Sequence, residues 1–157
     1  MITLPQQQSF HPPALPDVGA SYPDHVLLSV RCYIADRTNR TTATSSTSEG
    51  HSIQVSFFAA KPPTLSYLCI FCPDADFTSE PRVVASQGNL ILLTTGIRSS
   101  ADPFVEAICY DYFVYSADGT GGSSLDLLLK PGHPITRANV GLVSSGSCGD
   151  GYDVVTL

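Results

Sequence analysis

Two cysteines, Cys69 and Cys72, stand at the C-x-x-C spacing that is typical of zinc sites and redox-active pairs. A redox pair needs a helix N-terminus or a nearby cation to lower the thiol pKa, and the sequence after Cys72 predicts no helix. In a β-strand, positions i and i+3 point to opposite faces, so these two sulfurs could not share one metal ion. The five cysteines of the chain therefore favour reduced, structural thiols. A small hydrolase or redox protein that uses Cys69 or Cys72 with a histidine is the alternative.

The remaining chemistry-bearing residues form no recognisable catalytic or metal-binding pattern. Asp74 and Asp76 lack the D-x-D-x-D-G loop of a calcium site, and the Ser-rich stretch at 144–151 lacks both the G-x-S-x-G context and a P-loop lysine. The histidines lie far apart, without the spacing of a zinc site: His11, His25, His51 and His133. We therefore expect no catalytic residues, no metal and no cofactor.

A polar cluster follows the first apolar stretch of the chain. It places Asp36 beside Arg37, Asn39 and Arg40. A carboxylate and a guanidinium at such a position form ion pairs that pin a loop, and they are also able to grip an acidic segment of a partner. The Thr41–Ser48 run that comes next predicts a solvated polar loop, with phosphorylation as the alternative role.

Composition excludes several classes of partner. Charged residues make up only 14% of the 157-residue chain, against about 25% in an ordinary soluble domain. The net charge of −6, with only 8 Lys and Arg residues, argues against nucleic acid and anionic membrane as partners. No apolar run approaches the roughly 20 residues that span a bilayer. The first residues lack the basic and apolar regions of a secretory signal, so we expect an intracellular, non-secreted protein.

Apolar residues follow a period of two along most of the chain, which is typical of strands. The Leu65–Phe71 run carries large residues on both faces, which predicts a central strand. We find no 12-residue segment with a clear helical period, so the sequence predicts an all-β chain of mostly antiparallel strands. The expected architecture is a partial, β-propeller-like sheet domain, with a β-sandwich as the alternative. The predicted strands are Val26–Ala35, Ile53–Ala60, Leu65–Phe71, Arg82–Ala85, Leu90–Thr95, Ala107–Ser116, Leu125–Leu129, Val140–Val143 and Tyr152–Thr156.

The pattern also predicts the domain limits and the core. Residues 1–25 are rich in Gln and Pro and predict a disordered tail, while residues 26–157 form one all-β domain. A proline-rich ligand for an SH3-type domain is the alternative for Pro12–Pro16, although no basic anchor sits beside it. The predicted core consists of the residues that share the inward phase of their strands: Leu28, Val30, Ile34, Val55, Phe57, Leu68, Ile70, Val84, Leu92, Phe113 and Val154.

Several stretches in order resemble a known plant family. They include Tyr33-Ile-Ala-Asp-Arg-Thr-Asn-Arg, Gly50-His-Ser-Ile-Gln-Val-Ser-Phe, Pro62-Pro-Thr-Leu-Ser-Tyr-Leu-Cys-Ile-Phe-Cys-Pro and Gly151-Tyr-Asp-Val-Val-Thr-Leu. Together they are similar to the N-terminal region of the domain-of-unknown-function 1618 family, which is expanded in grasses and looks related to F-box-associated β-propeller domains. The resemblance implies a chain that is truncated relative to longer members. It also implies a regulatory role, in stress responses or reproductive isolation, and no catalytic residues.

The last predicted strand ends at the final residues of the sequence, which predicts an open sheet edge at Tyr152, Val154, Val155 and Leu157 unless the strand around Val26 closes onto it. Open edges pair with a second copy of a chain or with a partner's strand. The sequence therefore favours a non-catalytic module that binds an unidentified protein, with self-association through this edge as a further expectation.

Overall fold

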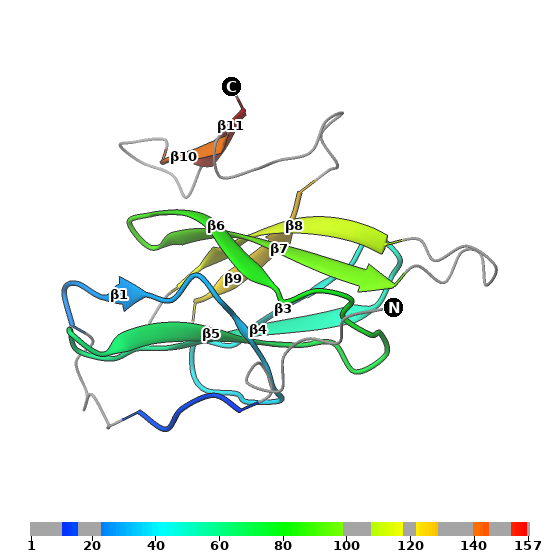
Figure 1. The fold of residues 1–157 in the computed structure, drawn as a ribbon. Helices are drawn as coiled ribbons and strands as arrows, with labels where there is room; N and C mark the ends of the chain where they lie inside the picture. Colours follow the sequence, from blue (N-terminus) through cyan, green and yellow to red (C-terminus); the bar gives the residue numbers. More distant parts are fainter. Residues whose placement is uncertain are drawn as a thin grey trace.

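The computed structural model describes residues 11–15, 23–98, 108–117, 122–128, 140–144 and 152–156; within the last two ranges it describes the backbone and the side chain of Leu142. These residues form strands and no helix, which confirms the all-β prediction (Figure 1). No helix in the described ranges has the length and apolar character that crossing a membrane requires. The strands are β1 (Leu27–Leu28), β2 (Tyr33–Ile34), β3 (Ala43–Ser46), β4 (Ser52–Phe58), β5 (Leu65–Phe71), β6 (Arg82–Gln87), β7 (Leu90–Arg98), β8 (Ile108–Ser116), β9 (Ser124–Leu127), β10 (Val140–Ser144) and β11 (Tyr152–Thr156).

The first sheet has the order β1–β5–β4–β3, with β2 also paired to β5. β3, β4 and β5 are antiparallel neighbours, whereas β1 and β2 run parallel to β5. The turn between β3 and β4 contains Gly50 at a φ of 85°, a conformation that glycine adopts without steric cost. β5 is central, as its apolar residues on both faces predicted.

The second sheet is an antiparallel meander in the order β6–β7–β8–β9. Gly88, at a φ of 58°, makes the tight turn between β6 and β7. The register of this pair shifts between Val83 and Ala85, which marks a β-bulge. The mostly antiparallel pairing predicted from short connections is therefore confirmed.

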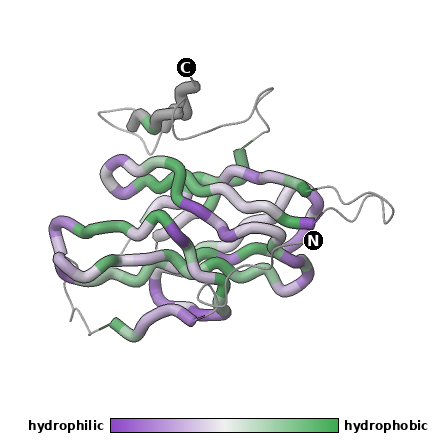
Figure 2. Tube along the Cα trace, viewed as in Figure 1, coloured by the Kyte–Doolittle hydropathy of each residue, from purple (hydrophilic) through white to green (hydrophobic). Residues whose placement is uncertain are grey.

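The two sheets pack face to face around one core. This core joins Ile53, Val55 and Leu68 of the first sheet to Leu93 and Phe113 of the second. Apolar residues follow the strands of both sheets, and hydrophilic residues gather in the connections (Figure 2). The arrangement is compatible both with a β-sandwich and with stacked sheets of a partial propeller.

A third layer covers part of the far face of the second sheet. β10 and β11 form an antiparallel hairpin that lies above this sheet in Figure 1. Leu142 of β10 packs in a second cluster with Val84, Leu92 and Val114. The second sheet therefore carries apolar side chains on both faces, as a sheet packed between two other layers does.

This middle position corrects part of the predicted core. The predicted burial is confirmed for Val55, Phe57, Leu68, Ile70, Val84, Leu92 and Phe113. However, Val84 and Leu92 face the third layer and do not share one inward phase with Phe113. The side chain of Val154 lies outside the described residues.

The predicted continuous strand Val26–Ala35 is wrong in one respect, because this segment changes partners. Arg31 pairs with Arg82 of β6 between the two short stretches that pair with β5. The Val83 N–H donates to the Val30 carbonyl (2.8 Å), and an Arg31–Glu80 ion pair (3.0 Å) supports the same crossing. Val30 is consequently 36% exposed, and the prediction that it belongs to the core is wrong.

Two further details of the prediction change at this end of the chain. Leu28 and Ile34 are half-buried at the border of the core. The run at 41–48, predicted as a solvated loop, contains strand β3, in which Ala43 pairs with Val55. Threonine hydroxyls that bond to the backbone allow this polar stretch to enter a sheet, so a lack of large apolar residues did not mean a loop.

Candidate functional site

The thiols of the C-x-x-C motif are buried on different sides of the first sheet. Cys72 packs in the core with Cys32, whereas the alternation of β5 places Cys69 on the outer face. Burial raises the pKa of Cys69 to about 11, which outweighs the opposite effect of the nearby Arg37. Burial also raises the pKa of Cys72, and the charge of Asp74 adds to this increase. Within the described residues, no group of three or more His, Cys, Asp and Glu side chains is placed to hold a metal ion.

These thiols should therefore react slowly in the folded protein. We expect iodoacetamide to alkylate Cys69 and Cys72 at least about tenfold more slowly than free cysteine at pH 8, because the thiolate is the nucleophile. Mass spectrometry of alkylated peptides gives the alkylation rates, with urea-unfolded protein as the control. A native rate at or above that of free cysteine would restore the cysteine-enzyme alternative.

The same burial predicts a pH dependence of stability. The free energy of unfolding should fall as the pH rises from 9 towards 11, since the Cys69 thiol ionises near 9.0 when unfolded and near 11 when folded.

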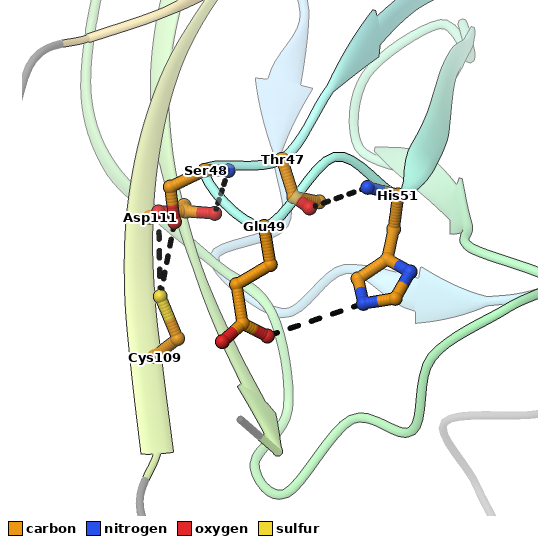
Figure 3. Close-up of polar contacts among 6 residues, drawn as sticks. All are labelled: Thr47, Ser48, Glu49, His51, Cys109 and Asp111. Atoms are coloured by element: carbon orange, nitrogen blue, oxygen red, sulfur yellow. Dashed lines mark hydrogen bonds and ion pairs between the residues drawn. The ribbon is translucent and has the colours of Figure 1, made fainter. Parts of the chain in front are cut away.

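A second polar cluster joins the tip of the β3–β4 hairpin to β8 (Figure 3). The Ser48 N–H donates to Asp111 Oδ2 (2.9 Å), and Ser48 Oγ lies 3.0 Å from Cys109 Sγ. These residue types occur in hydrolytic sites, but the His51 ring lies on the other side of the hairpin tip and pairs with Glu49 (Nε2 to Oε2, 3.9 Å). The buried Asp111 carboxylate therefore acts as an anchor for the hairpin.

The predicted loop-contact residues Asp36, Arg37 and Arg40 all lie in the described part of the chain, and their role as a contact for a partner stays a prediction. Asp36 Oδ1 accepts a bond from the Gln54 side chain (3.4 Å), and Arg40 is exposed. Arg37 lies over the Phe58 ring, with its guanidinium carbon 5.6 Å from the ring centroid. The residue that points to a possible site is therefore Arg37, through its aromatic neighbours.

The Asn39 side-chain amide anchors this loop. Its Nδ2 donates to the Phe57 carbonyl (2.7 Å), and its Oδ1 accepts bonds from the N–H and the hydroxyl of Thr41 (2.8 and 2.6 Å). The Thr41 hydroxyl in turn accepts the Phe57 N–H (2.9 Å). Loop and strand β4 are thus joined by a network of short neutral hydrogen bonds.

Three aromatic side chains contact one another on the outer face of the first sheet: Tyr33, Phe58 and Tyr67, which we call the aromatic face. Phe58 and Tyr67 are register partners on β4 and β5, and their rings stack at 5.4 Å and 24°. Tyr33 meets Tyr67 edge to face at 4.9 Å. The Arg37 guanidinium borders this group and donates to the Tyr67 hydroxyl (3.3 Å).

Part of the N-terminal segment lies on the aromatic face. The Tyr67 hydroxyl donates a 2.6 Å hydrogen bond to the carbonyl of Pro13. Residues 11–15 run along the side of the first sheet that faces away from the second sheet (Figure 1, dark blue). Tyr67 is only 2% exposed although it points away from the core between the sheets. The proline content of this segment gave no sign of where it would dock.

The outer face continues beyond this segment as an exposed apolar pair. Leu27 and Leu65 are register partners on β1 and β5, and the alternation of β5 puts Leu65 on the same face as Tyr67. They are 47% and 53% exposed. Adjacent exposed leucines on a sheet face are a common feature of interaction surfaces.

A cavity of about 550 Å³ opens on the inner side of β1. Leu28, Phe57 and Ile91 line it together with the partly exposed Val26, and Asn89 of the β6–β7 turn contributes polar atoms. The cavity and the outer face flank β1 from two sides. The N-terminal border of the first sheet therefore concentrates the accessible apolar surface of the described chain.

The predicted edge at Tyr152, Val154, Val155 and Leu157 lies outside the described side chains. The backbone of β11 pairs with β10 from Val140↔Thr156 to Ser144↔Tyr152. The strand at Leu27–Leu28 pairs with β5 and does not close onto β11. Edge-driven self-association stays a prediction.

Comparison with known proteins adds no relative to this picture. No family model, curated protein or solved structure matches the chain. The function therefore has to be argued from the geometry of the aromatic face and the exposed leucines.

Proposed function

We propose that this chain is a non-catalytic protein-interaction module whose binding surface is the outer face of the first sheet. The observation that carries the proposal is the 2.6 Å bond from Tyr67 to the Pro13 carbonyl, since this face already binds the backbone of another segment of the chain. The exposed Leu27 and Leu65 extend the same face. Aromatic and aliphatic anchors beside an arginine are the residue types that dominate binding energy at protein interfaces.

The chemistry of the remaining candidates supports a binding role. The raised pKa values of Cys69 and Cys72 keep both thiols protonated near neutral pH, and the His51 ring pairs with Glu49. The thiols of Cys69 and Cys72 are buried in the packing of the first sheet, and Asp111 holds the β3–β4 hairpin through the Ser48 N–H. A small cysteine-dependent hydrolase or redox protein is therefore the weaker hypothesis.

The family resemblance supports the same proposal at a coarser level. The similarity to the N-terminal region of the domain-of-unknown-function 1618 family favours a regulatory interaction role in a plant. The low content of Lys and Arg favours a protein partner over nucleic acid. We propose an intracellular location from the sequence alone. Identification of the partner protein would identify the pathway.

The proposed surface can be tested with a random peptide library selected on the full chain. Peptides that bind should lose at least about tenfold in affinity for a Leu65→Asp variant, because a charge would replace an exposed apolar contact. Ile108→Asp is the matched control, since Ile108 is 44% exposed on β8 of the other sheet. Fluorescence polarisation gives the affinities, and a thermal melt checks that both variants fold.

An equal loss of affinity in both variants would place binding elsewhere on the molecule. If the selection enriches no peptide that binds the folded chain, the interaction proposal falls as a whole.

A further inference from the structure

The segment on the aromatic face has the spacing of an extended proline-type helix. Within His11-Pro12-Pro13-Ala14-Leu15, the half-buried residues are Pro12 and Leu15, while His11, Pro13 and Ala14 are exposed. Pro12 and Leu15 are three residues apart, and the polyproline II helix repeats every three residues. One side of such a helix would therefore carry both contacts to the sheet.

The face beneath this segment has the chemistry that such a helix requires. A polyproline II backbone makes no internal hydrogen bonds, so its carbonyls remain free to accept bonds from a receptor. Tyr67 supplies that donor to the Pro13 carbonyl, and its ring stacks on Phe58 and meets Tyr33 at its edge. Aromatic-lined grooves are the recurring receptors for proline-rich segments.

We infer that the aromatic face of Tyr33, Phe58 and Tyr67 is a receptor for proline-rich extended segments, and that residues 11–15 occupy it in cis. The inference rests on the proposed function and names the class of partner that the face takes. The chain's own segment acts as a competing ligand, so a partner's segment binds only to the fraction of molecules in which residues 11–15 have left the face.

The exposed leucines give a partner an advantage over the internal segment. At about 3.1 Å per residue, five residues in the polyproline II conformation span roughly 16 Å. The internal segment leaves Leu27 and Leu65 exposed on the same face. A longer proline-rich ligand with a further apolar residue would cover these side chains as well, and this contact is what allows it to displace the internal segment.

The test uses a fluorescent peptide with two copies of the His-Pro-Pro-Ala-Leu sequence of residues 11–15. Its affinity is measured for the wild-type chain and for a Pro12→Ser, Leu15→Ser double variant, which weakens the internal contact at two positions outside the sheet. We expect the peptide to bind the double variant at least about fivefold more tightly, because apparent affinity scales with the unoccupied fraction of the face. Adding Tyr67→Phe to the double variant should weaken binding about two- to tenfold, since one hydrogen-bond donor is lost.

Two matched controls accompany these measurements. Tyr110→Phe, at an exposed tyrosine on β8, should leave the affinity of the double variant unchanged. A peptide in which alanine replaces every proline should bind at least about fivefold more weakly, because it is not preorganised in the extended conformation. Thermal melts of all variants confirm that they are folded.

Each contrary result has a distinct meaning. Equal affinity for the wild type and the double variant overturns occupancy in cis, and so does sedimentation that shows a dimer which the double variant abolishes. Equal binding of the proline-free peptide, or no effect of Tyr67→Phe, overturns the ligand class while the proposed interaction function stands. If neither this peptide nor any library peptide binds, the inference and the proposed function fall together.

Discussion

Replacing Phe113 with alanine is expected to lower the free energy of unfolding by about 3–5 kcal/mol. Phe113 lies at the centre of β8 with no exposed surface, and it packs in the core that joins the two larger sheets. Its removal leaves a cavity between two sheets whose spacing is fixed by the surrounding side chains. Urea titration followed by circular dichroism measures the loss.

The control for this change is Tyr110→Ala on the same strand. Tyr110 is 49% exposed, so its truncation should cost less than about 1 kcal/mol. A Phe113→Ala loss below roughly 1 kcal/mol would show that β8 faces the opposite way from the described fold.

The second large effect is expected for Asn39→Ala, with a loss of roughly 2–4 kcal/mol. Asn39 makes three short side-chain hydrogen bonds, to the Phe57 carbonyl and to the N–H and hydroxyl of Thr41. Each neutral hydrogen bond contributes about 0.5–1.5 kcal/mol, and partners left unpaired in a buried place add to the loss. Thr41 is itself buried, so water does not readily replace the missing amide.

Two substitutions separate the hydrogen bonds from the loop itself. Asn39→Asp keeps the acceptor for Thr41 but removes the donor to Phe57, so its stability should fall between the wild type and Asn39→Ala. Thr38→Ala, at an exposed neighbouring position, should change stability by less than about 0.5 kcal/mol. A loss for Asn39→Ala no larger than that for Thr38→Ala would mean that the network does not hold the loop.

The sequence predicts the burial of Phe113, but it does not predict the hydrogen bonds of Asn39. The burial of Phe113 follows from the alternation of apolar residues along one strand, which is a local pattern. The role of Asn39 does not, because its partner Phe57, 18 residues away, reaches it through the pairing of β3 and β4. The sequence placed Asn39 in a polar cluster with Asp36, Arg37 and Arg40, but it did not show which hydrogen bonds the Asn39 amide makes, because hydrogen-bond geometry is not visible in a sequence.

The candidate site could be predicted only in fragments. The large residues on both faces of Leu65–Phe71 indicated a central strand, and the Gln- and Pro-rich composition of residues 1–25 predicted a disordered tail. Their meeting through Tyr67 and Pro13 depends on how the chain returns across the outer face of a sheet, 54 residues apart in sequence. No local pattern encodes such a contact, because its free energy comes from aromatic surface that the sheet itself assembles.

By itself the sequence determined where most strands lie, that helices are absent from the described residues, and which side chains of each strand are apolar. The alternation of apolar residues is a property of neighbouring positions, and it does not depend on which strand is the pairing partner. The tertiary structure alone decided the partners. It pairs Arg31 with β6, places the polar stretch Ala43–Ser46 in a sheet, and buries apolar residues on both faces of the second sheet. These outcomes depend on long-range pairing and on the burial of whole sheet faces. The sequence of one strand does not specify which sheet edge that strand will pair with.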